Sequence, residues 1–231
     1  MNELKTGNFI VSFIDLLGAK EGMKTDSNGM LIKVHDAYKE SIDAYKEMFG
    51  SYPEDVNYRI FSDNIIVFCQ YESVDISEAF KVIVLLSSLI QIQFMLKDYI
   101  VRGGISTGDF YFDDVMVWGN ALSKAYYIES KLSVYPRIVI ERELIDTIKE
   151  KTKDNIELED FNNDFIKMDN DGLYYVDYYH RLSKVSESVT YNVICKRAYN
   201  NMMQYYDNSR IFAKWHWHYN QLCRYMASEK E

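Results

Sequence analysis

A polar step between two apolar runs, at residues 59–68, is the feature that most constrains how this chain folds. Ile60 and Phe61 precede the step, and residues 65–68 follow it with further β-branched and aromatic side chains. This pattern predicts a β-hairpin with Ser-Asp-Asn at 62–64 as its tip. A carboxylate at the end of a buried hairpin is costly to desolvate, so Asp63 is a candidate magnesium ligand. The alternative is that residues 62–64 form only a turn.

A second acid lies in a similar setting near the start of the chain. Residues 8–15 are mainly β-branched and aromatic and end in Asp15, and a turn containing Gly18 follows. We predict a buried central strand with Asp15 at its C-terminal end, and then a short helix. The amides of such a turn suit phosphate oxygens. As an alternative to metal binding, Asp15 is a turn former or a helix cap.

The remaining pattern predicts an α+β protein. Apolar periodicity and glycine positions predict helices at 31–49, 76–97, 119–132 and 141–151, and strands at 99–108, 115–118 and 135–140. Two adjacent glycines, Gly103 and Gly104, predict close approach of a neighbouring segment or of a ligand to the backbone. The resulting order β-α-β-β-α-β is that of a ferredoxin-like or palm sheet with helices on one face.

The second part of the chain is predicted to add to this core. Residues 154–163 are acidic and predict a solvated loop, and 165–179 predict a hairpin around a turn at 169–172. From residue 186 the pattern is helical, with a break near 207–209. We therefore predict a main domain at 1–182 and a helical extension at 183–231 that packs on the core or on a dimer partner.

Composition excludes several classes of protein. The net charge is −9 with no block of lysine or arginine, which argues against a binder of nucleic-acid backbones but allows a nucleotide ligand. The three cysteines are scattered, so we predict neither a disulfide framework nor a zinc site. The N-terminus lacks a signal-peptide pattern, and the apolar segment at 80–95 is too short and polar to span a membrane. These features predict a cytoplasmic protein.

The predicted order of strands brings the two acids together. The first strand and the hairpin lie side by side, so Asp15 and Asp63 meet at one sheet edge, where they repel each other unless cations separate them. Two Mg²⁺ or Mn²⁺ ions about 3.5–4 Å apart would do so and would clamp the oxygens of a phosphoryl transfer. Strand alternation puts Arg59, Phe61 and Asp63 on one face, with Arg59 roughly 13 Å along the strand, where it would read a nucleotide base.

These residues resemble a known family. Four segments are similar to the signature strands of class III nucleotidyl cyclases and to the helix start that follows them: FIDLLG at 13–18, FSD at 61–63, RGGISTG at 102–108 and WGNALSKA at 118–125. The similarity covers roughly residues 8–140. Within this superfamily the chain is more similar to the bacterial pyrimidine cyclases of Pycsar anti-phage systems, on residues 103–105, 125–130, 135–139 and 214–220.

The resemblance implies a lyase that works as a homodimer with active sites at the subunit interface. Its reaction would convert a nucleoside triphosphate to the 3′,5′-cyclic monophosphate and pyrophosphate, and a separate effector would read the product during phage infection. Asp15 and Asp63 fall on the two metal-binding aspartates, and the main-chain carbonyl of Ile14 or Leu16 is an additional ligand.

The chain also departs from the family pattern. Ser123 and Tyr127 stand where adenylyl and guanylyl cyclases have the Asn and Arg that stabilise the transition state. Arg59 and Met116 occupy the base-reading positions. Because arginine offers only donors, it suits the carbonyl acceptors of a pyrimidine, and we favour UTP over CTP.

Two further arginines are candidates for holding phosphates. They are Arg102 and Arg137. The alternative for Arg102 is a pair with a nearby acid, and the alternative for Arg137 is to brace the strand after Pro136. His216 and His218 point to different helix faces and favour packing over metal binding.

Three other functions remain open from the sequence. One is a cyclase-like module that senses a nucleotide without turnover, which the loss of the usual Asn and Arg favours. Another is an adenylate or guanylate cyclase. The last is a polymerase-like palm, against which Asn64 counts because a second acid is expected at that position.

Overall fold

Strand β1 (Gly7–Leu16) is the centre of the fold in the computed structural model, which describes residues 4–51, 53–71, 74–153, 155–179, 182 and 188–228. It lies in a sheet of order β2-β3-β1-β4-β6-β8-β7, with β5 paired to β4 beside that path. All neighbours pair antiparallel except β4 and β6, which are parallel. The other strands are β2 (Val56–Phe61), β3 (Asn64–Gln70), β4 (Val101–Phe112), β5 (Val117–Trp118), β6 (Ile138–Ile140), β7 (Ile166–Met168) and β8 (Tyr174–Val176).

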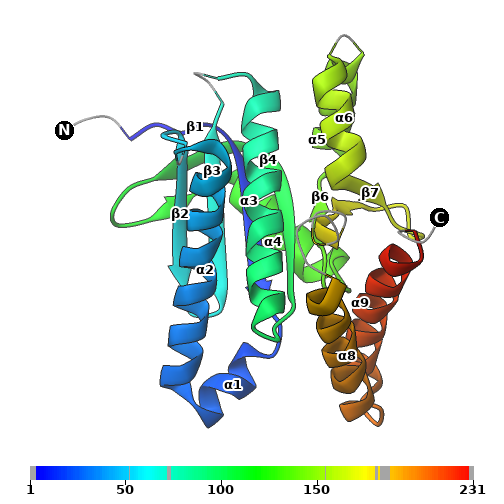
Figure 1. Cartoon of the computed structure of the whole chain (residues 1–231). Coiled ribbons are helices and arrows are strands. Elements are labelled where there is room, and N and C mark those ends of the chain that lie inside the picture. Colours follow the sequence, from blue (N-terminus) through cyan, green and yellow to red (C-terminus); the bar gives the residue numbers. More distant parts are fainter. Residues whose placement is uncertain are drawn as a thin grey trace.

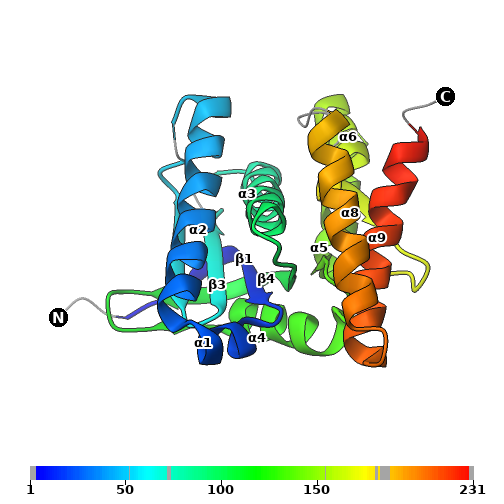
Figure 2. The same cartoon turned by 60° about the horizontal axis from the view of Figure 1, so that its bottom comes forward.

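Helices cover both faces of this sheet, as Figure 2 shows for α2 and α3 on one side and α4 on the other. The described helices are α1 (Ala19–Thr25), α2 (Ser27–Phe49), α3 (Ile76–Leu96), α4 (Asn120–Tyr127), the π-helical turn η1 (Ile128–Leu132), α5 (Arg142–Thr152), α6 (Ile156–Phe165), α8 (Ser188–Gln204) and α9 (Ser209–Ser228). The α+β class and the order of helices and strands along the core match the prediction. The expectation that helices cover only one face of the sheet is wrong.

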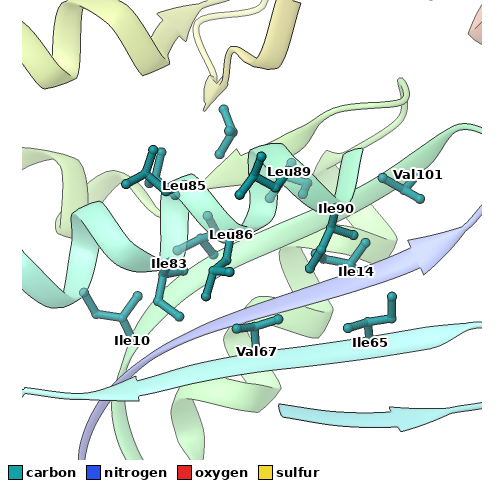
Figure 3. Close-up of a cluster of buried hydrophobic side chains, with 14 of the residues drawn as sticks. Ile10, Ile14, Ile65, Val67, Ile83, Leu85, Leu86, Leu89, Ile90 and Val101 are labelled. Atoms are coloured by element: carbon teal, nitrogen blue, oxygen red, sulfur yellow. The ribbon is translucent and has the colours of Figure 1, made fainter. Parts of the chain in front are cut away.

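Period-two alternation along β1 supplies both faces with apolar side chains. Ile10 and Ile14 face the cluster that contains α3, and Phe9, Val11 and Phe13 face the cluster that contains Ala121 and Ala125 of α4. Figure 3 shows the first cluster, in which Ile83, Leu86 and Ile90 of α3 lie over the sheet.

A glycine explains how α4 approaches the second face so closely. A side chain at Gly104 would place its Cβ 2.3 Å from the main-chain oxygen of Ala125. The absence of a side chain therefore lets α4 pack directly on β4, which confirms the close approach predicted from the adjacent glycines.

Helix α3 is the one described helix long and apolar enough to cross a membrane by length and composition. Within the fold, 78% of its apolar window is buried. A buried hydroxyl pair, Ser12 and Ser87 at 2.9 Å, also joins β1 to α3. The apolar surface of α3 is therefore used mainly for packing on the sheet.

The region predicted as an acidic loop is a helix. Residues 156–165 form α6, and the Asn155 side chain caps it by accepting a hydrogen bond from the amide of Leu158. Leu158 is fully buried, and Phe161 and Phe165 pack against the same core, so apolar side chains at helical spacing determine the structure despite the acidic residues between them. Asp154, the first residue of the predicted loop, lies outside the described residues.

The C-terminal helices pack against each other and against the core of their own chain (Figure 1). Their cluster joins side chains of α3, α8, α9 and the segment after β8: Ile92, Met95, Tyr178, Tyr179, Tyr191, Ile194 and Leu222. The predicted start of the extension, at 183–187, lies outside the described residues.

A neutral histidine is buried in this cluster. Nδ1 of His218 lies 2.7 Å from the Tyr179 hydroxyl and 3.1 Å from that of Tyr178, and burial lowers the pKa of His218 to about 3. His218 therefore has the packing role predicted for it, whereas His216 is exposed and stacks on Phe212.

We expect acid to weaken the fold through His218. Its pKa is 6.5 in the unfolded chain and about 3 in the native state, so between these values the unfolded chain binds more protons. The free energy of unfolding should fall as pH drops through this window, by up to about 1.4 kcal/mol per pH unit from this group. Urea unfolding at several pH values should give a shallower slope for His218→Gln and an unchanged slope for His216→Gln. Equal slopes for wild type and His218→Gln would contradict the assignment.

Candidate active site

Asp15 and Asp63 lie together where β1 ends and the neighbouring strand β3 begins. In the pairing of β1 with β3, Asp15 lies opposite Asn64, and the amide of Leu16 donates a 3.0 Å hydrogen bond to the carbonyl of Asp63. The tight turn that carries Asp63 is completed by Ser62, which has a positive φ of 56°. Both carboxylates line a cavity of about 420 Å³, which we call the aspartate cavity.

Arg102 links this cavity to a buried acid. It lies opposite Asp15 on β4, with its Nε 3.2 Å from an Asp15 carboxylate oxygen. Its Nη2 is 2.7 Å from Oε1 of Glu129, which is only 3% exposed. Burial raises the pKa of Glu129 to about 7, although the Arg102 guanidinium acts in the opposite direction. Arg102 is thus paired with nearby acids, which was the alternative to phosphate binding. Both acids, Asp15 and Glu129, line the aspartate cavity.

Sequence reasoning missed Glu129, although a signal for it was present. Ala121 and Ala125 are fully buried on α4, and Glu129 continues their four-residue spacing onto the same face. An acid in a stripe of buried alanines is unusual enough to mark a site.

Two further cations of the cavity come from the C-terminal helix α9. Arg210 and Lys214 line it with Asp15 and Asp63. Burial lowers the pKa of Lys214, and the nearby Arg102 and Arg210 add to this effect. Sequence reasoning missed both residues because nothing local in the sequence connects residues 210–214 to residue 15.

The donors at this edge fit divalent cations of the magnesium type. Mg²⁺ binds through one or two carboxylates plus water and substrate phosphates, which matches the pair Asp15 and Asp63. Across the described ranges no group of three or more His, Cys, Asp or Glu side chains is placed to hold a metal. Of the two predicted main-chain donors, Leu16 lines the cavity, whereas the buried Ile14 is not part of its lining.

Arg59 does not line the aspartate cavity of its own chain. Its guanidinium donates to the carbonyls of Tyr58 and Asp113, at 2.9 and 3.0 Å, and lies over the ring of Phe112. The predicted common face with Asp63 fails because β2 ends at Phe61 and Asp63 belongs to the turn, where strand alternation no longer holds.

Arg59 instead lies beside the turn that bears Met116. The Asp113 side chain accepts hydrogen bonds from the amides of Val115 and Met116, so the same residue joins this turn to Arg59. The structure therefore brings the two predicted base-reading positions to one region, separate from Asp63.

The other predicted residues lie in two further places. Ser123 and Tyr127, four residues apart on α4, line a second cavity of about 420 Å³ next to β6 and the β7–β8 turn. Arg137 is fully buried and paired with Asp169 and Asp171. This position fits the alternative role, bracing of the strand after Pro136, better than phosphate binding. Arg137 does not line the aspartate cavity.

Comparisons with known proteins show what this chain resembles. No family model matches the chain, and no curated protein matches it. Among solved structures, it is similar to the monomeric guanylyl cyclase domain of the RhoGC fusion protein from the aquatic fungus Blastocladiella emersonii. That match has 15% identity and a TM-score of 0.53, and it covers 75% of this chain and 98% of that one.

Two other solved structures agree with this result. The catalytic core of a rhodopsin-guanylyl cyclase with converted specificity, in complex with ATPαS, is 17% identical with a TM-score of 0.52 over 76% of this chain and 98% of that one. The guanylate cyclase domain of RhGC from Catenaria anguillulae, in complex with GTP, is 16% identical with a TM-score of 0.50 over 74% and 96%. The chain therefore has the α+β palm fold of class III nucleotidyl cyclase domains.

Proposed function

We propose that this protein is a nucleotidyl cyclase that converts a pyrimidine nucleoside triphosphate, UTP in preference to CTP, to its 3′,5′-cyclic monophosphate and pyrophosphate. The observation that carries the proposal is the pair of carboxylates, Asp15 and Asp63, on adjacent strand ends at one cavity that also holds Arg102. The proposal assigns catalysis to residues 1–182 and regards 183–231 as a helical extension.

The residues of the cavity have separate roles in this reaction. Asp15 and Asp63 would hold two Mg²⁺ or Mn²⁺ ions. Of the two candidate carbonyl donors, Ile14 and Leu16, the one of Leu16 is favoured because Leu16 lines the cavity. When bound, the ions favour ionisation of the ribose 3′-hydroxyl and neutralise the charge on the departing pyrophosphate. The 3′-oxygen attacks the α-phosphorus, the bond to the β-phosphate oxygen breaks, and the hydroxyl proton leaves to solvent. Arg102 keeps Asp15 in position and adds positive charge near the phosphates.

A homodimer would bring the remaining predicted residues to the site. Phe61 and Tyr126 both contact the ring of Phe13 on the α4 face of the sheet, yet they are 48% and 55% exposed. Tyr127, the next residue of α4 after Tyr126, is 57% exposed. Large apolar side chains left open together favour a protein partner. A second copy on this face would supply Arg59 and Met116 to the base, and Ser123 and Tyr127 to the ribose and phosphates.

Product analysis tests the proposal. The purified protein would be incubated with ATP, GTP, CTP and UTP in turn, with Mg²⁺ or Mn²⁺, and the products identified by mass spectrometry. Cyclic UMP or cyclic CMP is the expected product. Cyclic AMP or cyclic GMP would retain the cyclase and contradict the pyrimidine preference, and no cyclic product from any nucleotide would contradict the proposal.

We expect Arg59→Ala to weaken base discrimination. The substitution removes donors suited to pyrimidine carbonyls, so the ratio of kcat/KM for UTP to that for ATP should fall roughly tenfold or more. Arg224→Ala, an exposed arginine on α9, is the control and should leave the ratio unchanged. An unaltered ratio in Arg59→Ala would remove this residue from base recognition.

The sequence resemblance to Pycsar cyclases supports a role in defence. The cyclic nucleotide would act in the cytoplasm as a second messenger for a separate effector. Cyclic pyrimidine nucleotides should rise after phage infection in cells that contain the wild-type protein and stay at background with Asp63→Asn. Equal levels in both strains would contradict this role.

A nucleotide sensor is the second candidate. It is favoured by Ser123 and Tyr127, which lack the amide and guanidinium found at these positions in adenylyl and guanylyl cyclases. Tight UTP binding without any cyclic product, also in extract of infected cells, would establish the sensor in place of the enzyme.

A further inference from the structure

Helix α9 presents two cations to the aspartate cavity. Arg210 and Lys214 line this cavity together with Asp15 and Asp63. Their spacing of four residues puts them on one face of the helix, and the same face continues to the buried His218. The inner face of α9 is thus apolar and aromatic where it packs on the core and positively charged where it borders the cavity.

Neither of these two cations is directly paired with an acid, although Asp15 and Glu129 lie near enough to Lys214 to act on its charge. Within the described part of the chain, neither Arg210 nor Lys214 makes a hydrogen bond or an ion pair, whereas Arg102 is paired with Asp15 and Glu129. Lys214 is half-buried, so its ammonium group has lost part of its hydration. The nearby Arg102 and Arg210 disfavour its charge further, and this outweighs the opposite effect of Asp15 and Glu129. An arrangement of this kind favours binding of an anion.

We propose that α9 supplies the polyphosphate-binding side chains of this site, with Lys214 and Arg210 contacting the phosphate oxygens of the nucleoside triphosphate. This inference rests on the proposed function, because it assumes that the phosphates lie at Asp15 and Asp63. The two residue types are complementary. The guanidinium of Arg210 can hold two phosphate oxygens at once, and the ammonium of Lys214 acts as a point charge.

The position of Lys214 over the cavity is held by contacts one helical turn further along α9. Trp217 donates a 3.0 Å hydrogen bond from Nε1 to Asp169, which is in turn paired with Arg137. His218 is hydrogen-bonded between the hydroxyls of Tyr178 and Tyr179. These contacts attach α9 to the sheet core, so its cations are fixed relative to Asp15. The helical extension then belongs to the active site.

Binding of inorganic triphosphate with Mg²⁺, measured by isothermal titration calorimetry on the full chain, tests this directly because the probe cannot be cyclised. We expect Lys214→Met to weaken binding roughly tenfold and the double variant Arg210→Ala/Lys214→Met to weaken it roughly a hundredfold. Lys214→Arg should retain most of the affinity. Lys196→Met, at an exposed lysine of α8, is the matched control and should bind as wild type does. The Tm of each variant shows whether the fold is kept.

Turnover separates this inference from the proposed function. With UTP, Lys214→Met should raise KM roughly tenfold and change kcat less, since the lost contact is already present in the bound substrate. Unchanged triphosphate affinity and KM in Lys214→Met, while cyclic nucleotide still forms, would overturn the role of α9 and leave the cyclase proposal intact. If triphosphate binding depends on Lys214 but the protein forms no cyclic product, the role of α9 is supported and the cyclase proposal is contradicted. Absence of triphosphate binding in wild type would also overturn the role of α9.

Discussion

Cyclic nucleotide formation should fall at least about a thousandfold when Asp63 is replaced by asparagine, and by a similar factor in Asp15→Asn. Both substitutions keep the size of the side chain and remove one negative charge. On the proposed mechanism this charge holds the divalent ions, and without them Arg102, Arg210 and Lys214 alone would have to neutralise the departing pyrophosphate. The loss should therefore appear in kcat, and it should persist at saturating nucleotide.

Metal binding gives this prediction a second readout. Mn²⁺ titration followed by electron paramagnetic resonance should show weaker binding to Asp63→Asn than to wild type. Asp43→Asn, at an exposed acid of α2, carries the same change of charge and should match wild type in both measurements. If Asp63→Asn retains more than a tenth of the wild-type rate, Asp63 does not hold a catalytic ion.

The largest effect on stability is expected at Arg137. Its fully buried guanidinium is paired with Asp169 and Asp171 and lies near the rings of Tyr135, Tyr175 and Trp217, at 5.5–5.9 Å from their centroids. Arg137→Met leaves the nearly buried Asp169 carboxylate without its cation. We expect the free energy of unfolding to fall by about 3–5 kcal/mol, as measured by urea denaturation.

Two further variants test whether the loss of stability comes from an unpaired buried charge. Arg142→Met removes an exposed arginine from a 3.8 Å pair with Asp146 and should cost less than about 1 kcal/mol. The double variant Arg137→Met/Asp169→Asn removes the charge that Arg137→Met leaves uncompensated, so it should recover part of the lost stability. A cost below about 1 kcal/mol for Arg137→Met, with impaired nucleotide binding, would return Arg137 to the phosphate-holding role considered from the sequence.

The parts of the fold that were predictable are those with local signals. The strand that carries Asp15 near its C-terminal end and the hairpin around Asp63 each show their apolar pattern and their turn within about ten residues. The acidic segment that became α6 was mispredicted because its charge was given more weight than the spacing of Leu158, Phe161 and Phe165. For Arg59, strand alternation was extended through a turn, where it does not apply.

The rest of the candidate site depends on contacts between distant segments. Glu129 reaches Arg102 from 27 positions further along the chain, and Lys214 enters the cavity of Asp15 only because α9 packs back on the core. No pattern within a short window contains that information. A partial signal exists for Lys214, since its spacing from His218 defines one helix face, but the partner of that face cannot be found from spacing alone.

The order of the cavity residues along the chain has a consequence for protein synthesis. Asp15, Asp63, Arg102 and Glu129 leave the ribosome in turn, and Arg210 and Lys214 follow only with α9. Domains tend to fold as their segments emerge. On the proposed assignment, a nascent chain therefore folds its sheet before it can bind a triphosphate tightly. A chain whose translation stops before residue 210 would have the proposed metal-binding carboxylates without the two α9 cations, and so would bind the triphosphate only weakly and form little signalling nucleotide.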